Sequence, residues 1–256
     1  MMSRTPHSTH LRSAARAYTH SLAEVFAESI WPTRCALCDK PGAVLCETCR
    51  LNLPYIDYWK ACVRCGAPLG KIQCSECNPV TLQQLGEKAP PFARCVCVSE
   101  FNGASSAIVT TYKDRGERRL ADEIACMLAE VIPPEWFHGC SISFIPATRR
   151  ALRRRGFDHA ELLAEKLAQR MDSSSVALFD PPDNKDQRTL SRSLRFANMD
   201  ESIRLKEGLL LGKALPQEVL LVDDVYTTGV SLITACKALQ NAGVENVYCA
   251  TFARVW

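Results

Sequence analysis

The sequence lacks any apolar run near the roughly 18 residues that a membrane span needs, and no apolar signal-peptide core follows its N-terminus. We therefore expect a soluble, cytoplasmic protein with no membrane span. The sequence also lacks a large excess of either sign of charge, because 31 basic and 28 acidic residues leave a formal net charge of only +3. So small a net charge does not by itself indicate a nucleic-acid binder, and local clusters must decide. Hydrophobic residues at 47% and charged residues at 23% exclude a fully disordered chain.

Acidic residues are absent before Glu24, and the first ten residues are predicted to be disordered. Apolar positions at helical spacing between Leu11 and Ile30 predict one amphipathic helix that ends before Pro32. Its few charges favour packing on the protein over membrane contact. We expect three parts along the chain: residues 1–34 with this disordered start and helix, a double zinc ribbon at 35–78, and an α/β domain at 92–256.

Cysteine, in contrast, is abundant, with 14 residues in the chain. Eight of them form four C-x-x-C pairs: Cys35/Cys38, Cys46/Cys49, Cys62/Cys65 and Cys74/Cys77. Two thiolates at this spacing can converge on one tetrahedral ion, whereas a redox motif needs a single pair. The pattern therefore predicts two closed structural zinc sites that activate no water. The spacing leaves open which pairs share an ion.

The other cysteines are expected to be small buried hydrophobes: Cys95, Cys97, Cys126, Cys140, Cys236 and Cys249. The predicted ribbon also carries basic and aromatic residues: Arg34, Lys40, Arg50, Tyr55, Tyr58, Trp59, Lys60, Arg64 and Lys71. Such residues can face nucleic acid, but their charges are few enough that a structural or partner-docking role is supported at least as well.

After residue 92 the pattern alternates between strands and helices, which predicts a parallel α/β sheet. Strands are expected at residues 92–101, 141–145, 219–222 and 247–255. Helices are expected at 104–113, 118–131, 158–171 and 231–241. Asp158 followed by Glu161 has the form of a capping box that opens the third of these helices.

Residues 219–231 (VLLVDDVYTTGVS) combine a predicted buried strand with two carboxylates, Asp223 and Asp224, at its carboxyl end. Open α/β sheets bind their ligands at this end of the strands. Successive amides at a helix N-terminus can surround a phosphate, with hydroxyls as further donors from Thr227, Thr228 and Ser231. Gly229 leaves room for close approach. The adjacent carboxylates suit sugar hydroxyls and a divalent cation.

Arginines are concentrated after the strand that ends near Pro146, at Arg149, Arg150, Arg153, Arg154 and Arg155. Guanidinium groups suit pyrophosphate or a nucleic-acid backbone, although such runs are often solvated faces. A long polar segment, read as either a closing lid or a disordered loop, carries Arg188, Arg192 and Arg195. Lys113 and Arg115 are further candidates to face the site or solvent, and His159 is either a titrating group or an exposed helix residue.

The segment from Val219 to Ser231 resembles the phosphoribosyl-pyrophosphate motif of type I phosphoribosyltransferases. Together with the four C-x-x-C pairs, Arg155-Gly156-Phe157 and Leu190-Ser191-Arg192, it makes residues 22–254 similar to the ComF family (ComFC and GntX-like proteins). The resemblance implies a type I phosphoribosyltransferase-like α/β sheet with flanking helices, preceded by a small Cys-rich zinc-ribbon domain. Asp158-His159 departs from the commoner Asn-Gln, and the turn after Pro146 is short.

By that likeness Asp223 and Asp224 hold the ribose hydroxyls. The 5′-phosphate would lie on Val225, Tyr226, Thr227, Thr228, Gly229, Val230 and Ser231. The pyrophosphate would lie near Pro146, Ala147, Thr148, Arg149 and Arg155. A mobile loop would carry Arg188, Arg192 and Arg195.

The resemblance thus implies a phosphoribosyltransferase that uses Mg²⁺ and phosphoribosyl pyrophosphate with an unidentified acceptor, linked to DNA uptake or nucleotide metabolism. No dedicated general base is visible. The alternative is a non-catalytic zinc-ribbon module that handles single-stranded DNA or senses nucleotides. Single-stranded DNA and DNA-uptake proteins are the expected macromolecular partners.

Overall fold

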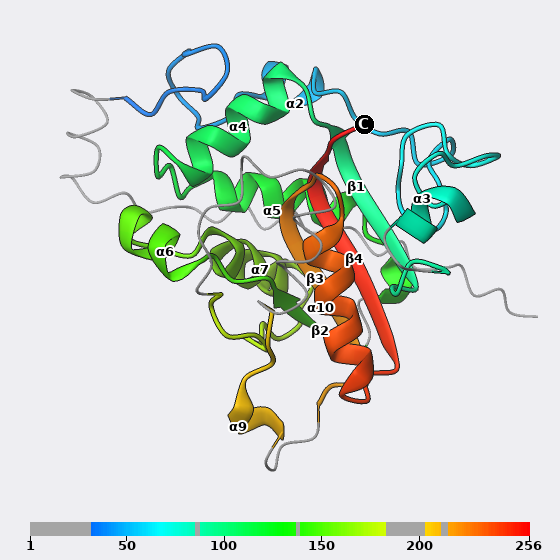
Figure 1. Cartoon of the computed structure of the whole chain (residues 1–256). Helices are drawn as coiled ribbons and strands as arrows, with labels where there is room; N and C mark the ends of the chain where they lie inside the picture. The colour runs from blue at the N-terminus through cyan, green and yellow to red at the C-terminus, as the bar shows by residue number, and fades with distance from the viewer. Residues whose placement is uncertain (1–31, 85–87, 137–138, 183–202, 211–214) are drawn as a thin grey trace, which may run out of the picture.

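The computed structural model describes residues 32–84, 88–136, 139–182, 203–210 and 215–256 (Figure 1). The helix expected between Leu11 and Ile30 lies outside these residues, and so do Arg188, Arg192 and Arg195. Among the helices of the described ranges, none has the length and apolar character that crossing a membrane requires.

A four-stranded parallel sheet forms the centre of the molecule (Figure 1). Its strands lie in the order β1 (Arg94–Glu100), β4 (Asn246–Arg254), β3 (Glu218–Tyr226) and β2 (Cys140–Phe144). Parallel neighbours need crossover connections, which place helices on both faces of the sheet. The central strands are accordingly apolar on both sides, so residues 219–222 of β3 are all buried.

Two cores form on the two faces of the sheet. On one face, Leu220 and Val222 of β3 pack with helices α4 (Gly103–Lys113), α5 (Leu120–Val131) and α7 (His159–Arg170). On the other face, Val219 and Leu221 pack with α10 (Val230–Asn241). The alternation follows from the two-residue period of a strand.

The cysteine-rich segment divides between these cores. Cys35 is buried in the first core, and α2 (Glu47–Leu51) follows Cys46 directly. Cys62 and Cys65 are buried in the second core, and α3 (Pro79–Gln84) follows Cys77. The remaining short elements are η1 (Pro134–Trp136), α6 (Arg149–Arg155) and α9 (Glu207–Leu210).

The parallel α/β sheet with flanking helices confirms the predicted fold class, and each predicted strand and helix of this domain is present within a few residues. β3 runs through both aspartates to Tyr226, whereas the pattern predicted a strand ending at Val222. The arginine-rich segment forms the helix α6, which the sequence interpretation did not assign. Of the six cysteines predicted to be buried, five are; Cys126 is half-buried.

Candidate functional site

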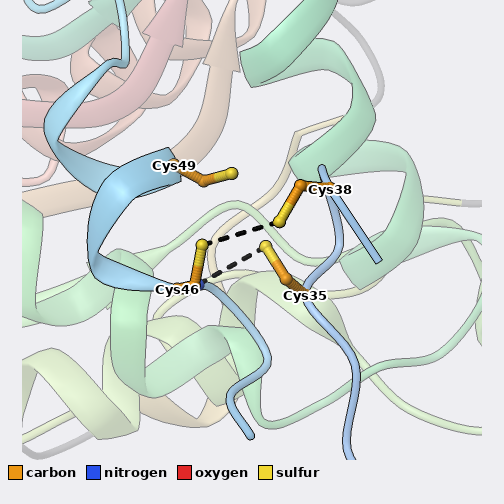
Figure 2. Close-up of side chains that lie close together, drawn as sticks. All are labelled: Cys35, Cys38, Cys46 and Cys49. Carbon is orange, nitrogen blue, oxygen red and sulfur yellow. Dashed lines mark hydrogen bonds between the residues drawn. The ribbon is translucent and has the colours of Figure 1, made fainter. Parts of the chain in front are cut away.

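The eight clustered cysteines form two groups of four, and none of the chain's described cysteines is in a disulfide. The first cluster consists of Cys35, Cys38, Cys46 and Cys49 (Figure 2). The second cluster consists of Cys62, Cys65, Cys74 and Cys77. In each, the four sulfur atoms lie within 4.8 Å of one another. Neighbouring C-x-x-C pairs therefore share a site, which the spacing alone left open.

The sulfur positions suit a tetrahedral metal ion. The Cys38 and Cys46 sulfurs lie 3.6 Å apart, and both Cys62–Cys77 and Cys65–Cys74 lie 3.5 Å apart. Zn–S bonds of about 2.3 Å place tetrahedral sulfurs about 3.8 Å apart. The Cys46 amide donates to Cys35 Sγ, as second-shell amides do in zinc knuckles. Both clusters are thus suited to structural zinc, and neither leaves a coordination position for catalysis.

The phosphate turn, which we define as residues 226–231, joins the end of β3 to α10. Gly229 takes a left-handed conformation with φ of 74° and forms the N-cap of α10. A Cβ added there would overlap the Tyr226 hydroxyl, so only glycine fits over this ring. The turn thus lies at the N-terminus of α10, a position suited to an anion.

A cavity of about 340 Å³ opens at this edge of the sheet. We call it the edge cavity. Its lining comes from the end of α4, the segment from β2 into α6, the start of α7, the end of β3 and the phosphate turn, with Pro182 and Ile203 from other segments. Its polar lining residues are Lys113, Thr148, Arg150, Arg154, Arg155, His159, Asp223, Thr227, Thr228 and Ser231.

The two aspartates of β3 have different surroundings. Asp223 is half-buried and lines the edge cavity. Asp224 is 2% exposed, and its carboxylate is paired with Lys113. The Lys113 ammonium donates to both of its oxygens, at 2.8 and 3.1 Å. The two carboxyl groups nevertheless lie close together, because one oxygen of each and a ring nitrogen of His159 are all within 4.8 Å of one another.

These environments move the pKa values of the two carboxyls in opposite directions. Burial and the charge of Asp224 raise the pKa of Asp223 well above its ordinary value. Burial alone would raise the pKa of Asp224 too, but Lys113 and His159 hold it well below its ordinary value. Asp224 is therefore the firmly ionised member, paired with Lys113, and Asp223 is the carboxyl that faces the cavity.

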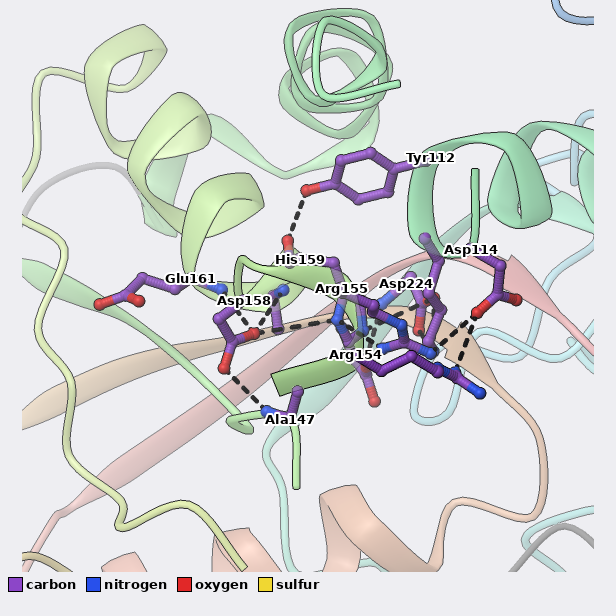
Figure 3. A network of polar contacts seen from close by, with 12 residues as sticks. Tyr112, Asp114, Ala147, Arg154, Arg155, Asp158, His159, Glu161 and Asp224 are labelled. Carbon is purple, nitrogen blue, oxygen red and sulfur yellow. Dashed lines mark hydrogen bonds and ion pairs between the residues drawn. The ribbon is translucent and has the colours of Figure 1, made fainter. Parts of the chain in front are cut away.

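His159 is buried beside this pair (Figure 3). Its Nε2 lies 3.8 Å from Asp224, and its Nδ1 lies 3.3 Å from the Arg155 guanidinium. Burial lowers its pKa to about 4, and Lys113 and Arg155 act in the same direction. The imidazole is thus neutral at pH 7. The expected alternative of an exposed helix residue is wrong, because α7 turns its first residue inward, where the Tyr112 hydroxyl bonds the His159 carbonyl.

Asp158 fixes the start of this helix to the cavity wall (Figure 3). Its side chain accepts from the amides of Ala160 and Glu161 as the predicted N-cap. Its second oxygen accepts from the Ala147 amide at 2.8 Å, which ties the segment after β2 to α7. Arg154 and Arg155 both reach Asp114 beyond the end of α4, at 3.3 and 3.1 Å.

The structure brings most of the predicted site residues to one place. Pro146, Ala147, Thr148 and Arg155 line the edge cavity with Asp223, Thr227, Thr228 and Ser231. Arg149 is exposed and lies outside the lining, because α6 turns Arg150 and Arg154 toward the cavity instead. The sequence named these two arginines and Lys113 as candidates that could face either the site or solvent, and all three line the cavity. The four-residue spacing of Arg150 and Arg154 was the signal that they share one face of a helix.

The segment that builds most of this site is similar to a known family of domains. The family model described as "Phosphoribosyl transferase domain" matches residues 151–255, which include the phosphate turn and its carboxylates. The parallel sheet with flanking helices and the N-terminal cysteine-rich region agree with the architecture implied by the resemblance.

Three curated proteins are similar over most of the chain. The "Competence protein ComFC" of Bacillus subtilis is 25% identical over 80% of this chain and 81% of its own length. The ComFC of Streptococcus pneumoniae is 23% identical over 84% and 96%, and the "Competence protein F" of Haemophilus influenzae is 24% identical over 82% and 90%. With the two cysteine clusters, these similarities fit a ComF-type protein with a zinc-ribbon region.

Proposed function

We propose that the edge cavity binds phosphoribosyl pyrophosphate with Mg²⁺ and that the protein transfers the phosphoribosyl group to an acceptor. The observation that carries this proposal is the single cavity shared by the phosphate turn, the Asp223 carboxyl and the α6 arginines. A turn of amides takes a monophosphate, a carboxylate takes ribose hydroxyls, and guanidinium groups take a pyrophosphate. The phosphoribosyltransferase match over residues 151–255 supports the same substrate class.

In this proposal each side chain has a separate task. Asp223 accepts from the ribose hydroxyls, while the amides and hydroxyls of the phosphate turn hold the 5′-phosphate. Arg150 and Arg154, which line the opposite wall, stabilise charge on the departing pyrophosphate. Mg²⁺ that arrives with the substrate neutralises the same charge. Asp224 acts through Lys113 and His159, whose positions it fixes.

The names of the three relatives support a place for this chemistry in competence. We propose that the chain acts in DNA uptake, with a nucleotide, a base or a DNA end as the acceptor. Two structural zinc ions in the cysteine clusters hold the N-terminal ribbon folded.

Turnover tests the proposal. Full-length protein with Mg²⁺ and labelled phosphoribosyl pyrophosphate should release pyrophosphate when candidate acceptors are added. Asp223→Asn should lower this rate by on the order of 100-fold, because an amide NH₂ replaces one of the two oxygens that accept from the ribose hydroxyls. Asp122→Asn is the matched control, since Asp122 pairs with Lys166 and Arg170 on the α5–α7 surface. Binding without modification of any acceptor would instead support a nucleotide-sensing module.

A second candidate function is a module that binds single-stranded DNA. The observation that favours it is a cavity of about 210 Å³ between the second cluster and β1. Tyr58 and Trp59 line it in edge-to-face contact, and the Lys71 ammonium lies 5.5 Å from the Trp59 ring centre. Trp59 is 73% exposed. Exposed aromatic rings beside cations suit stacked bases and a phosphate backbone.

Affinity for single-stranded DNA tests this second function. We expect binding that weakens steeply with salt and that falls by about tenfold in Trp59→Ala, through loss of one stacked base. Leu51→Ala is the matched control, because Leu51 is similarly exposed and lies on α2, beside the first cluster. Binding that is independent of salt, or equal in the two variants, would contradict this candidate.

A further inference from the structure

Arg254 is a buried cation at the end of β4 that the proposed chemistry does not use. Its exposed fraction is 0%, and it is among the largest fully buried side chains of the described residues. Its ion-pair partner is a carboxylate oxygen of Glu76, 3.8 Å away, and its Nε has no hydrogen-bond partner within the described structure. A buried guanidinium needs compensating charge, so its surroundings call for an explanation.

One side of Arg254 faces the second cluster. Its Nη1 donates to the Cys65 carbonyl at 2.7 Å, and its Nη2 lies 3.8 Å from Cys65 Sγ. Four thiolates around a divalent ion carry a net charge of about −2. Arg254 thus contacts a ligand residue of this cluster, and the zinc-bound cluster adds negative charge beside the guanidinium beyond the single carboxylate of Glu76.

The other side of Arg254 faces the phosphate turn. Its guanidinium carbon lies 3.9 Å from the centre of the Tyr226 ring, in a stacked cation–π contact. Tyr226 is 7% exposed, and its hydroxyl end occupies the space where a Cβ of Gly229 would be. The ring therefore lies directly beneath the backbone that shapes the turn.

The backbone reinforces this connection. The Val255 amide donates to the Tyr226 carbonyl at 2.9 Å, and the Cys95 amide of β1 donates to the Arg64 carbonyl at 2.7 Å. The segment of the second cluster therefore bonds the start of β1 and the end of β4, and the end of β4 in turn bonds the phosphate turn. Within the described residues, the first cluster packs toward α5 instead, through buried Cys35 and the Arg50–Glu123 ion pair.

We infer that Arg254 and Tyr226 couple metal ligation at the second cluster to the shape of the phosphate turn, so that the turn is ordered for phosphate binding only when this cluster is loaded. Arg254 is a positioning residue, since it touches neither the edge cavity nor the reacting atoms. The effect on phosphate binding rests on the proposed function. The effect on the conformation of the turn does not, because it is expected with or without ligand.

Hydrogen exchange of the full-length protein tests the coupling without any substrate. Cys77→Ser and Cys49→Ser each remove one half-buried ligand, from the second and first cluster respectively, and native mass spectrometry counts the zinc retained. We expect faster exchange of the amides of residues 226–231 in Cys77→Ser and wild-type exchange in Cys49→Ser. Equal exchange of the turn in both variants would overturn the inference.

Arg254→Met provides the test that leaves all eight thiolates in place, should Cys77→Ser fail to fold. It should retain two zinc ions at saturating zinc and still show faster exchange at residues 226–231. Arg254→Lys should restore zinc affinity in part, because the charge remains, but not the protection of the turn, because the stacking on Tyr226 is lost. Wild-type protection of the turn in Arg254→Met would contradict the coupling.

Binding measured by calorimetry separates the two proposals. Cys77→Ser should bind phosphoribosyl pyrophosphate about tenfold more weakly than Cys49→Ser, a coupling of ordinary size. If the wild-type protein binds none of it, the proposed function fails while the exchange result still decides the coupling. If the wild type binds but the two variants bind equally, the coupling fails and the proposed function stands.

Discussion

The two cysteine clusters have the same ligand set but different neighbours. At the first cluster, Arg50 follows Cys49 and reaches Glu123 and Glu130 of α5, so the charge beside the knuckle is paired with carboxylates. At the second cluster, Arg254 is buried against Cys65, and its ion-pair partner Glu76 lies 3.8 Å away, between two cysteines of the cluster. The difference teaches that a structural metal site can stabilise only its own segment or can also support a distant site. Which of the two holds depends on the cation whose charge the metal site compensates.

The largest expected effect is on stability. In urea unfolding at fixed zinc, Cys77→Ser should lower the free energy of unfolding by about 3 kcal/mol more than Cys49→Ser. The reason is that the second-cluster variant removes negative charge from beside a fully buried guanidinium, whereas Arg50 beside the first cluster is partly exposed. Equal losses in the two variants would remove the distinction between the clusters, whatever the total cost of losing each zinc ion.

The next effect concerns the turn above Tyr226. Gly229→Ala should weaken phosphoribosyl pyrophosphate binding by on the order of 100-fold and lower the free energy of unfolding by about 1–3 kcal/mol, because a left-handed residue gains a Cβ that overlaps Tyr226. Gly243→Ala is the matched control, with φ of 99° and no atom within 4 Å of the added Cβ. Calorimetry and thermal melts measure both; identical behaviour of the two variants would show that the packing of Tyr226 is unimportant.

A third prediction concerns the pH dependence of stability that buried His159 causes. The pKa of His159 is lowered to about 4 in the folded protein, so the unfolded state takes up a proton first as pH falls through the ordinary value of 6.5. Stability should therefore fall between pH 6.5 and 4, and His159→Gln should remove on the order of 1–3 kcal/mol of that fall.

The difference between wild type and His159→Gln is the quantity to measure, because acid also releases zinc and this effect cancels between the two proteins. Unfolding free energies at half-unit pH steps provide it. A difference that does not change with pH would show that His159 is not held neutral by its buried surroundings.

The smallest expected effect is at the ion pairs between Arg50, beside the first cluster, and α5. Arg50→Ala should lower the free energy of unfolding by about 0.5–1 kcal/mol, since its partners Glu123 and Glu130 are partly exposed. Phosphoribosyl pyrophosphate affinity should not change. A loss of affinity in this variant would mean that the first cluster is also connected to the edge cavity.

The sheet and the turn were predictable because their signals are local. Four apolar residues before Asp223, helical spacing in α5, and the N-cap at Asp158 each specify an element without reference to the rest of the chain. The phosphate turn was predictable for the same reason, since its glycine and hydroxyl residues are adjacent in sequence.

The missed features all depend on contacts between distant segments. The burial of His159 depends on Tyr112 and Asp224, which come from α4 and β3. Arg254 falls in a strand of apolar residues, and nothing in its neighbourhood indicates the Cys65 carbonyl 189 residues away. The sharing of each site by adjacent C-x-x-C pairs depends on how the ribbon folds back, which spacing does not determine.

The edge cavity as a phosphoribosyl pyrophosphate site is the central claim, and a crystal structure with Mg²⁺ and this ligand tests it most directly. We predict that the 5′-phosphate lies on the amides of residues 226–231, that the ribose hydroxyls bond Asp223, and that the pyrophosphate lies between Ala147 and Arg154. A ligand bound elsewhere, or an edge cavity that stays empty at saturating ligand, would contradict the account.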